Sequence, residues 1–208
     1  MTKCKKARII ERMNFLAHLL LSNNDDDIMI GNFIADSVRS AEWENFNREV
    51  VYGIELHHKI DFFTDNHSVV EQSKKRLRDK HGKYTPVIVD IVYDHFLAAN
   101  FSRYSEEPLA AFVENCYALF HRRWDELPTA VQRMLPYMEE GNWLVNYGSR
   151  AGLQRTLTGM SRRASFRNKM DEATSDVFDD YDRFEEDFHA YFPLLLDYVS
   201  EEIRKLPW

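Results

Sequence analysis

Acidic and imidazole side chains recur at four-residue intervals along segments whose other residues follow the apolar pattern of helices. The positions in three such segments are Asn32 and Asp36; His57, Asp61 and Asp65; and Asp90, Asp94 and the adjacent His95. Residues four apart on a helix lie side by side, with Cβ atoms roughly 5–6 Å apart. Like-charged carboxylates at this spacing repel by about 0.2–0.5 kcal/mol per exposed pair, and burying them unpaired costs far more. The spacing therefore predicts a helical bundle that holds a divalent metal.

Glycine and proline are scarce in this chain. Seven glycines and six prolines among 208 residues are too few for a loop-rich β-sandwich or a glycine-rich nucleotide loop. The sequence has no segment of strict apolar–polar alternation, which is the pattern of half-buried strands. The length suits one full domain better than two. We therefore expect an all-α fold, a single-domain helical bundle over residues 13–208.

The apolar periodicity and the helix-capping residues predict where the helices begin and end. The predicted ranges are 14–21, 28–38, 47–66, 68–80, 85–97, 108–124, 128–138, 152–160 and 175–205. Gly82 suits the end of the fourth helix, and Pro86 suits the first turn of the fifth. Pro193 lies within the last range, and we expect that helix to break near it.

Residues 1–12 form a basic segment ahead of a second methionine, Met13, and we expect this segment to be a disordered extension. No apolar run approaches the roughly 18 residues of a membrane span, so no membrane association is expected. The two cysteines, Cys4 and Cys116, form no disulfide framework. A protein without a disulfide framework is typical of the reducing cytosol, and we expect a cytoplasmic protein.

Carboxylate and imidazole side chains together form a mixed set of metal ligands. The candidates are His18, Asp36, His57, Asp61, Asp65, Asp90, Asp94 and His95. Carboxylates suit Mg²⁺ and Mn²⁺, and imidazole shifts the preference toward Mn²⁺, Fe²⁺ or Zn²⁺. Asp94 and His95 lie in an apolar run, so we expect at least one of them to be buried, where a charge must be paired or metal-bound.

Each of these residues also has a structural interpretation. His18 can be a core histidine with its hydrogen bonds satisfied, Asp61 and Asp65 can form a solvated helix face, and Asp90 can cap a helix or pair with arginine. Candidate ligands occur on several predicted helices at once, and this repetition favours a metal site over the separate structural interpretations.

The net charge of −7 is unevenly distributed. Residues 149–169 carry six basic side chains and no acid, and residues 74–83 form a second basic cluster. These clusters indicate docking surfaces for an anionic partner. Residues 171–202 are strongly acidic, which argues against binding to nucleic acid.

Several segments resemble the acyl carrier protein phosphodiesterases. They are NFLAH (14–18), GNFIAD (31–36), GIELHHKIDFFTD (53–65), DIVYDHFL (90–97), WLVNY (143–147) and GMSRR (159–163). The resemblance implies an enzyme that hydrolyses the phosphodiester joining 4′-phosphopantetheine to a serine of holo acyl carrier protein. It also implies a divalent metal, commonly Mn²⁺ with Mg²⁺ or Fe²⁺ as alternatives, and a fold related to the all-helical HD-type metal-dependent phosphohydrolases.

Roles for the candidate residues follow as hypotheses. The expected metal ligands are His18, Asp36, His57, Asp61 and Asp94. The expected groups that orient or deprotonate water are Asp36, Asp65 and His95. The carrier protein is acidic, and the basic residues expected to dock it are Lys74, Lys75, Arg78, Arg162 and Arg163.

Two other functions stay open from the sequence. The ligand set alone equally permits a metal-dependent phosphohydrolase of a nucleotide or another small phosphate ester. A non-catalytic helical binding module, in which the paired acids are solvated or salt-bridged, is the second alternative.

Overall fold

The computed structural model describes residues 15–206, and every regular element in that range is a helix. The α-helices are α1 (Phe15–Leu20), α2 (Asp26–Ile34), α3 (Arg48–Asn66), α4 (Ser68–His81), α5 (Thr85–Ala99), α6 (Leu109–Arg122), α7 (Thr129–Glu140), α8 (Trp143–Asn146), α9 (Arg150–Arg163), α10 (Ala173–Asp179) and α11 (Tyr181–Arg204). Short 3-10 helices lie between them: η1 (Ala35–Ser37), η2 (Ser40–Asn45), η3 (Gly82–Tyr84), η4 (Phe101–Arg103), η5 (Trp124–Glu126) and η6 (Met170–Glu172). The all-α prediction is confirmed, whereas the predicted disorder of residues 1–12 lies outside the described residues.

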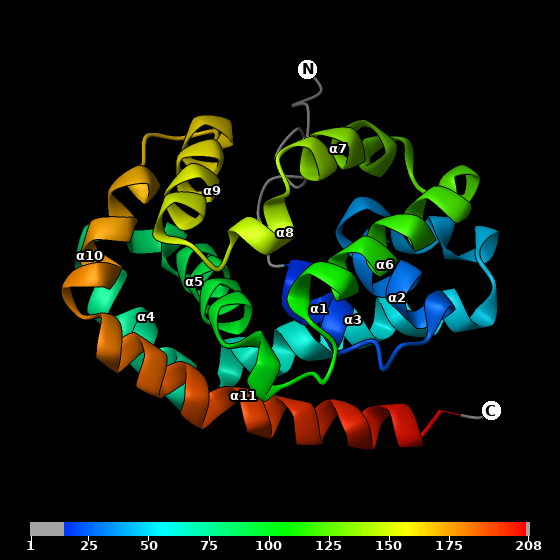
Figure 1. Ribbon diagram of the computed structural model, residues 1–208, viewed down its shortest axis with the longest axis horizontal. Coiled ribbons are helices and arrows are strands. Elements are labelled where there is room, and N and C mark those ends of the chain that lie inside the picture. Colours follow the sequence, from blue (N-terminus) through cyan, green and yellow to red (C-terminus); the bar gives the residue numbers. More distant parts are fainter. Residues whose placement is uncertain (1–14, 207–208) are drawn as a thin grey trace.

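The helices form two groups that share one long helix. Figure 1 shows α4, α5, α9 and α10 on one side of the molecule and α1, α2, α3, α6 and α7 on the other. Helix α11 runs along the edge of both groups and packs against α3, α4 and α5. Within residues 15–206, no helix combines the length and apolarity that a membrane crossing requires.

Helix α5 is buried on nearly all of its faces. Its fully enclosed residues include Ile88, Val92 and Phe96, and a helix that is apolar all round belongs inside a core. Asp94 and His95 lie within this run and are only 1% and 2% exposed. The expectation that at least one of them is buried is therefore confirmed for both.

The ends of several helices follow from local sequence signals. The side chain of Asn47 caps α3 by accepting the N–H of Val50, and α4 ends at Gly82, whose φ of +53° suits glycine. The expected break near Pro193 is wrong. The helix is interrupted at Asp180, between α10 and α11, and α11 continues through Pro193. Buried residues such as Phe188 and Leu195 lie on both sides of Pro193, and their packing holds the helix together despite the lost hydrogen bond.

Helices α2 and α3 approach closely through two glycines. A Cβ placed on Gly31 would lie 2.0 Å from the carbonyl oxygen of Val50 and 2.8 Å from the Cα of Gly53. Only glycine permits this distance, because any side chain would overlap the backbone of the other helix. The crossing brings Asn32, next to Gly31, beside His57, one turn beyond Gly53.

Candidate metal centre

His18 of α1 and the residues His57 and Asp61 of α3 meet in one cluster. His18 Nε2 lies 3.4 Å from Asp61 Oδ1, and His57 Nε2 lies 3.3 Å from Asp61 Oδ2. The two imidazole rings stack with their centroids 4.0 Å apart. Two ring nitrogens and one carboxylate, whose ligand atoms all lie within 4.8 Å of one another, thus come together.

Asn32 orients both histidines. The Nδ1 of His18 lies 2.8 Å from the side-chain oxygen of Asn32, and the Nδ1 of His57 lies 3.0 Å from its backbone oxygen. The amide nitrogen of Asn32 donates to the carbonyl oxygen of His18 and to Ser22 Oγ, which fixes which end of the amide faces the ring. Because both Asn32 oxygens only accept, each Nδ1 carries a proton, and in the neutral form of each ring the lone pair is therefore on Nε2. A hydrogen-bonded outer partner of this kind sets the orientation and tautomer of metal-ligating histidines.

Asp94 fixes the short helix that carries His18. Its two carboxylate oxygens accept the backbone N–H groups of Leu16 and Ala17 at 3.0 and 2.9 Å. These N–H groups belong to the first turn of α1, where no intrahelical acceptor exists, so Asp94 caps α1 from the buried helix α5. Burial raises the pKa of Asp94 to about 8, and the two N–H groups oppose that rise.

Asp36 lies on the more open side of the cluster. Its Oδ1 is 3.6 Å from His57 Nε2, and its side chain is 36% exposed, compared with 11% for Asp61. It follows α2 directly, in the 3-10 helix η1. Asp36 is therefore close enough to join a metal site and is accessible to water.

The cluster has the donor set that a divalent cation needs. His57 Nε2 is buried and makes no hydrogen bond within residues 15–206, although carboxylate oxygens of Asp61 and Asp36 lie 3.3 and 3.6 Å away. Two neutral imidazoles and a carboxylate are ligands that Mn²⁺, Fe²⁺ and Zn²⁺ accept. A cation beside the two Nε2 atoms and Asp61 would satisfy this nitrogen, so the residues fit a bound metal.

Asp65 and Asp90 lie outside the cluster and line a neighbouring cavity. Asp65 is one turn beyond Asp61 on α3 and pairs with Lys74 Nζ at 3.0 Å. Asp90 is one turn before Asp94 on α5. On α3 the spacing of four thus continues from the cluster into the cavity, and on α5 it leads from Asp94, the cap of α1, into the same cavity.

His95 also lies outside the cluster. Its Nδ1 donates to the carbonyl oxygen of Tyr147 at 2.7 Å, and its Nε2 is 3.1 Å from the hydroxyl of Tyr181. Burial lowers the pKa of His95, so the imidazole is neutral and the Tyr181 hydroxyl donates to Nε2. Adjacent positions on α5 therefore face different surroundings, Asp94 toward α1 and His95 toward Tyr147 and Tyr181.

The predicted docking residues differ in exposure. Lys75, Arg78, Arg162 and Arg163 are exposed, and Arg78 makes a bidentate pair with Glu71. Lys74 is only 5% exposed and bonds Asp65 within the cavity. It is therefore not part of an exposed basic face.

The fold and the cluster define an all-helical protein with a buried His–His–Asp site suited to a divalent cation. The family model described as acyl carrier protein phosphodiesterase matches residues 13–195, and the chain belongs to that family.

Relatives named acyl carrier protein phosphodiesterase cover nearly the whole chain. The relative from Escherichia coli O6:H1 is 32% identical over 194 residues, which is 91% of this chain and 99% of the relative. The relative from Photorhabdus laumondii is 30% identical over 189 residues, 89% of this chain and 94% of its own. No solved structure matches the chain, so the expected relation to HD-type phosphohydrolases stays a prediction.

Sequence reasoning missed two roles at this site. The spacing of four pairs Asn32 with Asp36 but does not predict that Asn32 orients both histidines. The signal was present, since Asn32 lies within the GNFIAD segment and an amide in an apolar helix needs buried partners. The capping contact of Asp94 had no sequence signal, because it joins residues far apart in the chain.

Proposed function

We propose that this chain hydrolyses the phosphodiester between 4′-phosphopantetheine and a serine of holo acyl carrier protein, releasing the apo carrier protein and 4′-phosphopantetheine. Membership of the acyl carrier protein phosphodiesterase family, over residues 13–195, is the observation that carries this proposal. The His18–His57–Asp61 cluster supports it, because phosphodiester hydrolysis needs a nucleophilic water and neutralisation of phosphoryl charge.

His18, His57 and Asp61 would hold a divalent cation, with Mn²⁺ proposed and Mg²⁺ or Fe²⁺ as alternatives. When bound, the cation would lower the pKa of a water and neutralise charge on the phosphoryl oxygens. Asn32 keeps the lone pairs of both Nε2 atoms directed at the site. Asp94 stays a predicted ligand, but its capping bonds to α1 support a positioning role.

Asp36 is the group we favour for accepting a proton from the attacking water, or for completing the metal ligands. It is the exposed carboxylate within 3.6 Å of a cluster nitrogen. As the water oxygen bonds to phosphorus, the bond between phosphorus and the serine oxygen breaks, and the serine oxygen takes up a proton. The predicted roles of Asp65 and His95 in activating water are less well supported, because Lys74 pairs with Asp65 and two tyrosines surround His95.

The carrier protein would dock on the exposed basic residues of α4 and α9. Arg162 and Arg163 lie at the end of α9, a helix with no acidic residue in its sequence. Exposed positive charge attracts an acidic partner and speeds its association. The buried free thiol of Cys116 suits a reducing compartment, and we propose that the reaction takes place in the cytoplasm.

Incubation of the protein with holo carrier protein and Mn²⁺, followed by intact-mass measurement of the carrier, tests the proposed reaction. The expected result is loss of the phosphopantetheine mass, abolished by EDTA. Nucleotides and small phosphodiesters are tested in parallel. Hydrolysis of these with an unchanged carrier mass would favour the small-ester phosphohydrolase, and no Mn²⁺-dependent rise in Tm would favour a non-catalytic module.

A further inference from the structure

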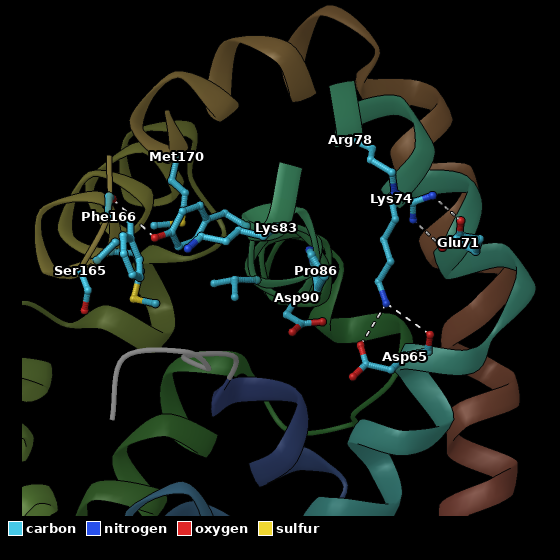
Figure 2. Close-up of a pocket in the computed structure, with 14 residues that line it drawn as sticks. Asp65, Glu71, Lys74, Arg78, Lys83, Pro86, Asp90, Ser165, Phe166 and Met170 are labelled. Atoms are coloured by element: carbon cyan, nitrogen blue, oxygen red, sulfur yellow. Dashed lines mark hydrogen bonds and ion pairs between the residues drawn. The ribbon is translucent and has the colours of Figure 1, made fainter. Parts of the chain in front are cut away.

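A cavity of about 610 Å³ lies between α4, the start of α5 and the segment that joins α9 to η6. Figure 2 shows Asp65, Glu71, Lys74 and Arg78 along one wall and Phe166, Met170 and Lys83 opposite, with Pro86 and Asp90 of α5 between them. This volume is within the range of small-molecule sites, roughly 300–1,000 Å³. It is therefore a pocket for a small molecule or a flexible arm rather than for a protein surface.

The two walls differ in chemistry. On one wall, Lys74 is buried and its ammonium group donates to the carboxylate and the backbone oxygen of Asp65. An ammonium group has three donors, so one of them is left for a ligand. The opposite wall and the start of α5 add apolar side chains, which include Val87, Met160 and Met170, beside Lys83. Such a pocket favours a ligand with a polar, hydrogen-bonding side and an aliphatic side.

Phe166 lies at the rim of the cavity. Its ring is 65% exposed, and the ammonium group of Lys83 lies 3.8 Å from the ring centroid. A large exposed aromatic residue on a cavity edge offers apolar surface to an entering ligand. The Lys83 ammonium group held over this ring adds a positive charge to this side of the cavity.

One end of the cavity is next to the metal cluster. Asp65 follows Asp61 by one turn of α3, a rise of about 6 Å along the helix axis. Asp90 precedes Asp94 by one turn of α5, and both Asp65 and Asp90 line the cavity. A molecule with its phosphoryl group at the cluster could therefore extend past Asp65 and Lys74 toward the apolar wall.

We infer that this cavity binds the pantetheine arm of the substrate, with the phosphodiester at the Asp65 and Asp90 end. The arm has amide groups, which suit Lys74 and the polar wall, and aliphatic groups, which suit Val87, Met160 and Met170. In this arrangement the serine of the carrier protein stays outside, and only the arm enters the molecule. The inference rests on the proposed function and specifies which part of the substrate the chain encloses.

Binding of free pantetheine, which has no phosphate, tests this inference by calorimetry on the whole protein with Mn²⁺ present. Wild type is expected to bind it, and Ala164→Phe, which fills part of the cavity, should weaken binding at least about tenfold. Phe166→Ala removes apolar surface at the rim and should weaken it severalfold. Because Phe166 is 65% exposed, this second variant keeps the test valid if Ala164→Phe fails to fold.

Ala118→Phe is the matched control, since Ala118 is exposed on α6 and does not line the cavity. It should bind pantetheine as wild type does. Unchanged affinity and unchanged KM for holo carrier protein in both cavity variants would overturn the inference, while hydrolysis of the carrier by wild type would leave the proposed function intact. Binding of inorganic phosphate but not pantetheine would also overturn it. Failure of wild type to hydrolyse the carrier would instead refute the proposed function.

Discussion

The imidazole rings of His18 and His57 stack with centroids 4.0 Å apart and planes 19° apart. They come from different helices, α1 and α3, and both Nε2 atoms face Asp61. Two protonated rings at this distance would repel, whereas two neutral rings with lone pairs on Nε2 form a ready pair of metal ligands. The stacked pair is therefore the central element of the candidate metal centre.

Asp61→Ala should abolish release of phosphopantetheine and leave the helical content unchanged. The Asp61 carboxylate is the group shared by both histidines, and without it the cluster loses the carboxylate that lies within 3.4 Å of both Nε2 atoms. At a free Mn²⁺ concentration of 100 times Kd, wild type should gain about 2.7 kcal/mol of stability, and the variant should lose most of this gain. Activity measured by intact mass, circular dichroism and Mn²⁺-dependent Tm provide the three readouts.

Glu55→Ala is the matched control for Asp61→Ala, because Glu55 is an exposed acid on the same helix. It should retain both activity and the Mn²⁺ effect. Asp36→Ala should also abolish activity, with a smaller loss of the Mn²⁺ effect. Full activity in either aspartate variant would remove that residue from the site.

Asn32→Leu should lower Mn²⁺ affinity by about 10–100-fold, the usual effect of losing an outer partner of a metal ligand. The substitution removes the acceptor for His18 Nδ1, while the backbone oxygen that accepts from His57 remains. It leaves the buried Nδ1 of His18 without its acceptor, while the carbonyl oxygen of His18 still accepts from Ser22 Oγ, so a loss of about 1–3 kcal/mol in unfolding free energy is expected. Calorimetric titration with Mn²⁺ and denaturant unfolding measure the two effects. Wild-type metal affinity would contradict the orienting role.

Asp94→Ala should destabilise the protein by about 0.5–2 kcal/mol or more, because α1 loses its cap. Metal affinity should fall with it, since α1 carries His18. Asp94→Asn keeps one acceptor oxygen and should recover part of both losses. A different outcome would identify Asp94 as a metal ligand rather than as a cap. In that case Asp94→Asn would regain stability, but its Mn²⁺ affinity would stay as low as that of Asp94→Ala.

Arg162→Glu combined with Arg163→Glu should raise KM for the carrier protein far more than KM for a small phosphodiester. The two exposed arginines attract an acidic protein, whereas a small ester needs no docking surface. The rise should shrink at high ionic strength because salt screens exposed charges. Equal changes for both substrates would argue against docking on α9.

Asp176→Asn should destabilise the protein by roughly 1 kcal/mol at neutral pH, and this difference should vanish in acid. Asp176 of α10 pairs with His81 Nε2 at 2.7 Å and Lys80 Nζ at 2.8 Å, both from α4. Burial acts to raise the pKa of Asp176, but the hydrogen bonds from Lys80 and His81 outweigh it and lower the pKa. The modest value reflects the partial exposure of the pair.

The sign of this pH effect follows from linkage. A carboxylate with a lowered folded pKa stabilises the fold above its unfolded pKa of about 3.9, and this stabilisation is lost as the pH falls through the folded value. Urea unfolding of both proteins between pH 7 and pH 2.5 measures it. A constant difference across that range would show that the Asp176 charge contributes nothing.

The helical architecture was predictable because its signals are local. The apolar period of α3, its cap at Asn47 and the end of α4 at Gly82 all depend on residues close in sequence. The prediction of a helix break at Pro193 is wrong because it too depends on a local signal. Proline disfavours a helix interior, but the packing of α11 overrides that preference. The basic pattern of α4 is also visible in the sequence, but it does not reveal which of its side chains are enclosed, as the buried Lys74 illustrates.

The sequence by itself determined the all-α fold, the family, and the residue types of the candidate metal centre at a spacing of four. The tertiary structure decided which of those residues meet. Helix periodicity places His57 and Asp61 on one face, but the rotation of each helix about its axis is set by packing. The Gly31–Gly53 crossing and the Asp94 cap bring Asn32 and His18 to the cluster, while packing of α5 places His95 elsewhere. Contacts between distant segments depend on the shape of the whole core, and local sequence patterns do not contain that information.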